Sequence, residues 1–412
     1  MTAANNTSYD ALLRELWPQE DIYDLLYEDA PFFAMVAKDT SFYEKIRHVA
    51  LGYGTTQGVG ADFASAKANK VGSVNAEFKI TPVTYYSLFS IQRQLLRRAG
   101  NKKAAILPAL ERESRMAMEA WKRDVQVLLW GSGVGDIGRV ATGGVSGSTI
   151  TLATTSDVRH FEQNMTLDVS SDNTGVAGVR TVASPLRITA VNRRTGVLTF
   201  STAVTTAIPG TGNGDYLYRQ GNYNAVVSSV QGWVPASDPT STLWFGLNRA
   251  ADTLRLGGIR TTATGLSPRA AAMKCAKECG ENGGRPTHYF LSPDDYLNLQ
   301  NELQSAGTLT FTKEPGAPID KWTFGTPFEG IQLMGPKGII KVFFDINVPV
   351  GHGFMLQLDT WTFGSMGKVP GFDDADGNKI LREADADAIE GRIVGDFQLW
   401  CEAPGKNARV AF

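Results

Sequence analysis

A glycine-rich run is the first feature of the sequence that could do chemistry. The run from Gly133 to Gly138, GVGDIG, matches by letter the fingerprint of dinucleotide-binding turns. In such turns a helix follows the glycines, and its N-terminus holds the pyrophosphate. Here a long helical pattern precedes the run and none follows it. We therefore interpret the run as a flexible exit from that helix and expect no cofactor.

Two groups of residues resemble metal ligands. Asp374, Asp376, Gly377 and Glu383 stand at the third, fifth, sixth and twelfth positions of a calcium loop. The first position is Phe372, which has no side-chain oxygen, and no helical pattern frames the loop. The region is better interpreted as a solvated acidic turn.

The three cysteines are Cys275, Cys279 and Cys401. The first two are four residues apart on one predicted helix face, but no histidine or cysteine pair at suitable spacing completes a zinc site. Three cysteines are also too few for a disulfide-stabilised secreted fold. We expect buried, small apolar side chains and no metal.

The histidines, His48, His160, His288 and His352, fall in four separate predicted elements. A catalytic triad can assemble from distant positions, so spacing alone leaves that alternative open. The sequence has no nucleophile elbow, no GxxxxGK[ST] phosphate loop and no HExxH. We therefore expect a protein that is not an enzyme. The dense basic cluster of Arg93, Arg97, Arg98, Lys102 and Lys103 fits either nucleic-acid contact or an ion-pairing face for an acidic segment.

Composition narrows the classes that remain. The chain has 412 residues, 42% of them hydrophobic, and a formal net charge of -2. This excludes a disordered chain and a free nucleic-acid binder that depends on a global basic field. The start of the chain lacks the pattern of a signal peptide, and no apolar run approaches the ~20 residues that span a bilayer. We expect a protein of more than one domain, made in a cytoplasm-like compartment and without a membrane.

Charge is distributed unevenly along the first hundred residues. Residues 1–36 carry seven acidic residues and one basic, with apolar side chains between them, whereas residues 41–100 carry eight basic and three acidic. Strand patterns at Tyr43–Leu51 and Glu77–Val83 enclose a soft stretch from Gly52 to Ser73. A loop of this length usually reaches for a partner, so we predict a long projecting hairpin.

The strongest helical pattern lies in residues 101–131, with an amphipathic stripe from Pro108, which we place in the first turn, to a stop at Gly131. Residues 132–224 then predict a small β-barrel or sandwich. Its expected strands are Thr149–Ala153, Met165–Val169, Leu186–Val191, Val197–Ser201 and Asp215–Tyr218. From residue 225 the patterns are mixed: helices open at Ser267-Pro268 and Ser292-Pro293, and strands follow at Ile331–Met334, Ile339–Asp345, Phe354–Leu358 and Arg392–Glu402.

This order of segments resembles the major capsid protein of tailed bacteriophages, a family with the HK97-type fold. The resemblance covers nearly the whole chain and lies in order and texture more than in a fixed motif. It implies an α+β fold with these parts: N-terminal arm 1–40, extended loop 41–100, spine helix of the peripheral domain 101–131, inserted β-rich domain 132–224, peripheral continuation 225–265, axial domain 266–365 and peripheral return strands 366–412.

The resemblance also implies a function. Copies would form the hexamers and pentamers of an icosahedral virion head that encloses double-stranded DNA, assembled in the host cytoplasm. A separate scaffolding protein, a portal and a decoration protein would be partners, with weak non-specific DNA contact. The expected inter-subunit contacts are Trp17, Phe32, Phe33, Phe63, Lys67, Lys70, Phe78, Tyr85, Tyr86, Arg93, Arg97 and Arg98.

Three alternatives remain open. An encapsulin-type compartment shares the fold but packages an enzyme, and such shells generally use shorter chains without a β-insert. An unrelated multi-domain enzyme should bring ionisable groups together in a pocket. A β-rich adhesin should carry an export signal.

Overall fold

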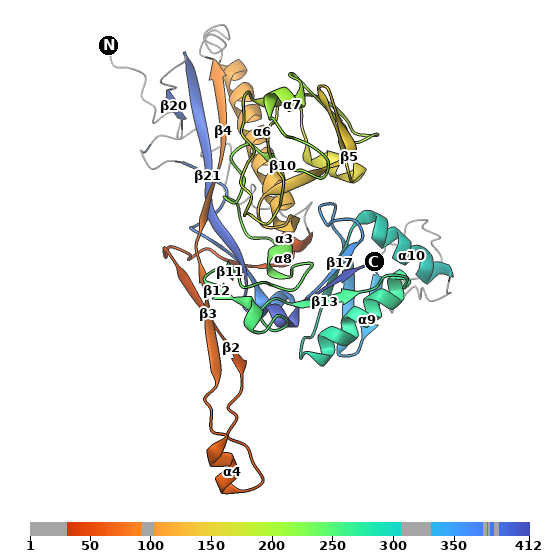
Figure 1. The fold of residues 1–412 in the computed structure, drawn as a ribbon. Helices are drawn as coiled ribbons and strands as arrows, with labels where there is room; N and C mark the ends of the chain where they lie inside the picture. Colours follow the sequence, from red (N-terminus) through yellow and green to blue (C-terminus); the bar gives the residue numbers. More distant parts are fainter. Residues whose placement is uncertain (1–30, 93–102, 306–330, 374–376, 378–379, 383–386) are drawn as a thin grey trace, which may run out of the picture.

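The computed structural model describes residues 31–92, 103–305, 331–373, 377, 380–382 and 387–412. Figure 1 shows a two-stranded hairpin projecting from a body in which a long helix, a barrel and two sheets pack together. Helices pack against sheets whose strand pairs are mostly antiparallel, as in an α+β fold.

The first sheet is built around one long strand, β21 (Ala388–Cys401). β21 pairs antiparallel with β4 (Val83–Gln92) from Ala388↔Gln92 to Phe397↔Val83. The other strands of this sheet are β1 (Ala37–Asp39), β18 (Trp361–Ser365), β19 (Gly371–Phe372) and β20 (Ile380–Arg382). Glycines on β21 and β18 admit aromatic rings, since a Cβ on Gly391 would lie 2.2 Å from the Phe89 ring.

The long helix α6 (Lys103–Trp130) packs against β4 and contributes to the main apolar core. Trp121 donates from Nε1 to the Tyr85 carbonyl at 3.2 Å, and Ser87 Oγ donates to the Ala117 carbonyl at 3.0 Å. The helix was predicted, but its start was wrong: Pro108 lies inside α6, not in the first turn. The proline removes one backbone hydrogen bond from α6, and the helix continues past it to Trp130.

The projecting hairpin consists of β2 (Arg47–Gly54) and β3 (Val74–Ile80), with a short helix α4 (Phe63–Ala68) at its tip. The two strands pair antiparallel from Arg47↔Ile80 to Gly54↔Val74. The sequence predicted this pair, but the first strand lies later and the second earlier than expected, and the tip helix was not predicted.

Six strands form a closed antiparallel barrel in the order β10-β5-β6-β9-β8-β7. Their bounds are β5 Asp136–Ser146, β6 Thr149–Leu152, β7 Thr166–Ser170, β8 Leu186–Asn192, β9 Val197–Phe200 and β10 Tyr216–Arg219. The 3₁₀ helix η1 (Thr155–His160) and the short helix α7 (Val204–Ala207) lie between strands. The interpretation of Gly133–Gly138 as a flexible exit was wrong in its second half, because Asp136 to Gly138 begin β5.

The second large sheet has the order β13-β22-β17-β14-β16-β15 and mixes parallel with antiparallel pairs. Its strands are β13 Ile259–Thr262, β14 His288–Leu291, β15 Ile331–Gly335, β16 Gly338–Phe344, β17 His352–Leu356 and β22 Ala408–Ala411. Helices α9 (Pro268–Glu281) and α10 (Pro293–Ser305) cover one face (Figure 1). Both helices start where the sequence predicted, and Ser267 caps α9 by accepting from the Ala270 N–H.

Short elements connect these parts. They are α3 Pro31–Met35, α8 Val230–Trp233, β11 Leu243–Trp244, β12 Leu247–Asn248, and the 3₁₀ helices η2 Arg249–Ala251, η3 Leu358–Thr360 and η4 Pro404–Lys406. α3 inserts Phe32 between Trp130, Phe290 and Trp361, with ring centroids 5.0–6.0 Å apart. Across the described ranges, no helix combines the length and apolar character needed to cross a membrane.

Candidate interaction surface

The tip of the projecting hairpin carries apolar side chains far from any core. Phe63 is 83% exposed, Val59 79% and Val71 59%. Lys67 and Lys70 lie beside them and are also exposed. Apolar residues scattered singly over a surface are ordinary, but three gathered at the end of a projection indicate a site of interaction.

Local chemistry explains why the tip is ordered. Asp62 caps α4 by accepting from the Ser65 N–H at 2.8 Å, and the Ser65 hydroxyl donates to it at 2.7 Å. These bonds, the backbone one first, lower the pKa of Asp62. A Cβ on Gly60 would lie 2.7 Å from the Ala66 nitrogen, so a glycine is needed where the chain turns back onto α4. The tip is therefore a defined shape that presents Phe63.

Other predicted contact residues lie lower on the hairpin and in the sheet. Phe78 is buried, with its ring 4.9 Å from Trp233 in an edge-on arrangement. Tyr85 is buried against α6, whereas Tyr86, next in the strand, faces outward and is 56% exposed. Alternation along β4 produces this difference. In the single chain, Tyr86 is available to a partner, and Phe78 and Tyr85 fix the surface in place.

Phe32 and Phe33 are also buried within their own chain. Phe33 meets Phe363 edge-on at 4.8 Å, and Phe32 packs in the aromatic cluster described above. The structure thus gives both residues an anchoring position for α3. Trp17, Arg93, Arg97 and Arg98 lie outside the described residues.

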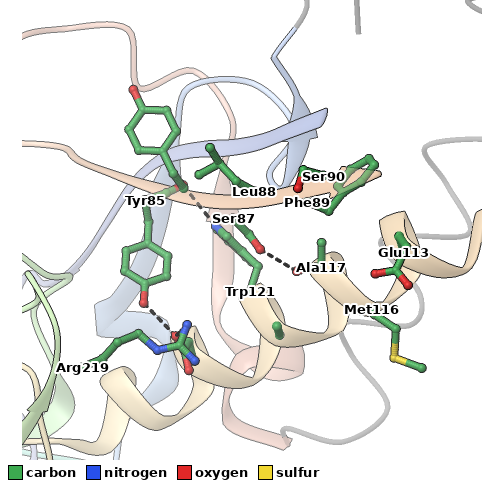
Figure 2. A pocket seen from close by; sticks show the side chains of 13 residues that line it. Tyr85, Ser87, Leu88, Phe89, Ser90, Glu113, Met116, Ala117, Trp121 and Arg219 are labelled. Atoms are coloured by element: carbon green, nitrogen blue, oxygen red, sulfur yellow. Dashed lines mark hydrogen bonds and ion pairs between the residues drawn. The ribbon is translucent and has the colours of Figure 1, made fainter. Parts of the chain in front are cut away.

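A hollow of about 420 Å³ opens between β4 and α6 (Figure 2). Its floor is polar: the Tyr85 hydroxyl donates to Asp124 Oδ2 at 2.8 Å, and Arg219 pairs with the same oxygen at 2.8 Å. Burial raises the pKa of Asp124, and burial followed by the Asp124 charge raises the pKa of Tyr85. Asn222 completes the group by donating to the Tyr85 hydroxyl at 3.1 Å.

This polar floor joins three parts of the molecule, since Tyr85 belongs to β4, Asp124 to α6 and Arg219 to β10. The carboxylate is satisfied by its two partners, so the arrangement stabilises the junction. Because the Asp124 carboxylate is held by both Tyr85 and Arg219, this group offers neither a free nucleophile nor a poised base.

The histidines do not converge. His48 contacts Glu77 at 3.1 Å, His160 contacts the Ile137 carbonyl at 2.8 Å, and His288 contacts the Thr287 hydroxyl at 2.8 Å. Burial lowers the pKa of His160 and of His352 to about 4. In the part of the chain that the structure describes, these contacts do not join into a nucleophile–histidine–carboxylate series, and no group of three potential ligands could hold a metal ion. The three cysteines are free and buried.

Sequence reasoning missed several exposed apolar residues. Val59 and Val71 lie in the stretch interpreted as soft, where only Phe63 stood out by size. Met334 and Ile339 form an exposed cross-strand pair on β15 and β16. Alternation in Ile331–Met334 places Met334 on the face of the strand opposite to Ile331 and Leu333, and this signal could have identified Met334 as exposed.

Comparison with protein-family models gives no match, and neither does comparison with curated proteins. Solved structures do match. The chain aligns with a chain of the cyanophage A-1(L) capsid with 13% identity and a TM-score of 0.51, covering 93% of this chain and 92% of that one. The capsid of a native GTA particle aligns with 9% identity and a TM-score of 0.43, covering 92% and 89%. The encapsulin complex of Synechococcus elongatus aligns with 7% identity and a TM-score of 0.43, covering 100% and 96%.

The cyanophage likeness extends over nearly all of both chains. It confirms, at the level of fold, the resemblance to major capsid proteins of tailed bacteriophages. The mixed helix and sheet content fits an HK97-like α+β fold.

Proposed function

We propose that this chain is a structural, non-enzymatic major capsid protein. Copies assemble into the hexamers and pentamers of an icosahedral phage head that encloses double-stranded DNA. The segments follow the order set out above, from an N-terminal arm at 1–40 to peripheral return strands at 366–412. Its proposed partners are a scaffolding protein, a portal and a decoration protein, and its proposed location is the virion.

One observation carries the proposal: a hairpin projects from the body (Figure 1), and its tip carries exposed apolar side chains. A monomer gains nothing from holding Phe63 and Val59 in water, whereas a neighbouring copy can bury them. The capsid-type fold supports the same conclusion. So does the opposition between acidic residues 1–36 and the basic hairpin region 41–100, because complementary charges steer association.

Substitution at the tip tests the proposal. We expect the wild-type chain, expressed alone or with its scaffold, to form closed shells in negative-stain micrographs. Phe63→Asp should abolish shells and leave a folded subunit, because the side chain touches no core and a buried carboxylate would destabilise the contact. Val176→Asp is the matched control, since Val176 is 80% exposed on the barrel, away from the hairpin.

The outcomes separate the alternatives. Normal shells from Phe63→Asp would contradict the role of the tip. Absence of any assembly by the wild-type chain under all conditions would contradict the capsid function. Shells purified from the natural source that contain a cargo enzyme and no DNA would favour an encapsulin-type compartment.

A further inference from the structure

A second, much smaller hairpin lies at the base of the projecting one. β11 and β12 pair through Leu243↔Asn248 and Trp244↔Leu247, which leaves Phe245 and Gly246 as a two-residue turn. Their φ angles are +48° and +80°. Positive φ at both positions marks the turn type that suits a tight hairpin, but it favours Asn-Gly, and a bulky residue in the first position is rare. The turn therefore holds Phe245 in a conformation that needs support.

Phe245 contacts the base of the projecting hairpin in two ways. Its carbonyl accepts a hydrogen bond from the Lys79 N–H of β3 at 2.8 Å. Its ring stacks on Trp233, with centroids 5.5 Å apart and planes 15° apart. Trp233 in turn meets Phe78 of β3 edge-on. Backbone and side chain of one residue thus contact the same strand, directly and through Trp233.

The small hairpin is itself fixed to the body. The Trp244 ring lies under the Arg249 guanidinium, 4.7 Å from it, and against Gly232, where a Cβ would lie 2.5 Å from the ring. Arg249 is buried and donates to the carbonyls of Gly232 at 2.9 Å and Trp233 at 3.2 Å. Any displacement of Trp244 would break these contacts.

We propose that the segment Leu243–Asn248 is a clip that sets the direction of the projecting hairpin. The clip holds the outer edge of β3 at Lys79 through the Phe245 carbonyl, and Phe245 and Gly246 are its positioning residues. In assembly, the clip would aim the tip at a neighbouring copy. That consequence rests on the proposed function, whereas the clip itself does not.

Hydrogen exchange of the wild-type full chain, read at single-residue resolution by mass spectrometry, tests the clip directly. Alternation along β3 places the Glu77 amide on the same strand edge as the Lys79 amide, two residues nearer the tip. After correction for intrinsic rates, we expect Lys79 to exchange roughly tenfold more slowly than Glu77, the effect of one retained hydrogen bond. Equal rates would overturn the proposal, and this comparison needs no variant to fold.

Two variants separate the contribution of the turn backbone from that of the Phe245 ring. Gly246→Val cannot adopt a φ of +80° without strain and should remove the Lys79 protection. Phe245→Asn keeps the favoured turn and should keep most of that protection while losing the stacking. Leu266→Thr, at an exposed position outside the clip, is the control and should leave the Lys79 protection unchanged.

Retained Lys79 protection in a folded Gly246→Val chain, or an equally full loss in Phe245→Asn, would overturn the assignment to the turn carbonyl. A Gly246→Val chain that frees Lys79 yet builds normal shells would leave the clip intact and remove its role in assembly. Failure of the clip and failure of the proposed function are therefore distinguishable.

Discussion

Two residues of η1, Asp157 and His160, have pKa values that burial shifts in opposite directions. Burial raises the pKa of the Asp157 carboxyl to about 6, despite the opposing charge of Arg159. Burial also lowers the pKa of His160 to about 4, although its Nδ1 contacts the Ile137 carbonyl. The His160 Nε2 is buried and has no hydrogen-bond partner. Both side chains are thus favoured in their neutral forms in the folded protein.

These shifts give opposite slopes to stability against pH. As pH falls from about 6.5 to 4, the unfolded chain takes up a proton at His160 that the native chain excludes, so the free energy of unfolding falls by at most about 3 kcal/mol. As pH falls from about 6 to 3.8, native Asp157 takes up a proton before the unfolded chain does, so the free energy of unfolding rises by at most about 3 kcal/mol. The two effects offset each other in the wild-type protein.

Substitution of either residue should leave the pH dependence of the unfolding free energy that the other residue causes. His160→Gln should make the protein relatively more stable towards pH 4, and Asp157→Asn should make its loss of stability in acid steeper while stabilising it at pH 7. Urea unfolding at several values between pH 4 and 7 measures both. Variant profiles that run parallel to the wild-type profile would contradict this account.

At the scale of elements, the barrel is the part of the molecule that most resembles an independent unit. Its core is separate from the main one and consists almost entirely of barrel residues, with Val127 of α6 as an addition. The chain enters at Asp136 and leaves at Tyr218, and these two residues are paired neighbours on β5 and β10. Closure removes the free strand edges that would otherwise need cover.

We therefore predict that residues 132–224, expressed alone, fold cooperatively. The isolated barrel loses the Arg123–Glu162 ion pair and the Val127 contact with α6, so it should be less stable than in the full chain but still folded. Circular dichroism with a sigmoidal thermal transition, and dispersed amide resonances, would support this. A disordered spectrum would show that the barrel depends on α6. Ile150→Ala, in the barrel core, is a control that should lower the transition.

Element boundaries also show what sequence can predict. The spacing in β6 to β10 and the caps of α9 and α10 are local signals, and the structure confirms those elements to within a few residues. β5 escaped prediction because three glycines between Gly138 and Gly144 obscure its alternation. α4 escaped because six residues form a helix only with the Asp62 cap and the turn at Gly60. Pro108 was misplaced because a long helix tolerates a proline that local preference would put at its start.

At the scale of the whole molecule, the sequence predicted the projecting hairpin but not which of the expected contact residues are exposed. Phe32, Phe63 and Tyr86 are all aromatic, yet Phe32 is buried and the other two are exposed. That difference depends on contacts between segments far apart in the chain, such as Phe32 with Phe290. The clip at Phe245 could not be predicted for the same reason, because its partner Lys79 lies more than a hundred residues earlier.

The position of α3 allows the role of the acidic N-terminal segment to be tested separately from that of the core. α3 begins at Pro31, and Phe32 and Phe33 complete the main core. Removal of residues 1–30 therefore leaves every described core contact in place, while it removes the acidic side chains proposed to reach a basic surface on a neighbouring copy.

We predict that the chain lacking residues 1–30 still folds cooperatively but fails to form shells. The matched control lacks residues 1–36: it should be destabilised by several kcal/mol, because two buried phenylalanines are lost from the core. Calorimetry measures the first property, and negative-stain micrographs with sedimentation measure the second. If attraction between charges drives the step, the full-length chain should also assemble less well as salt rises above physiological strength. Intact shells from the chain without residues 1–30 would contradict the proposed role of the acidic segment, and they would leave the projecting hairpin as the element on which assembly depends.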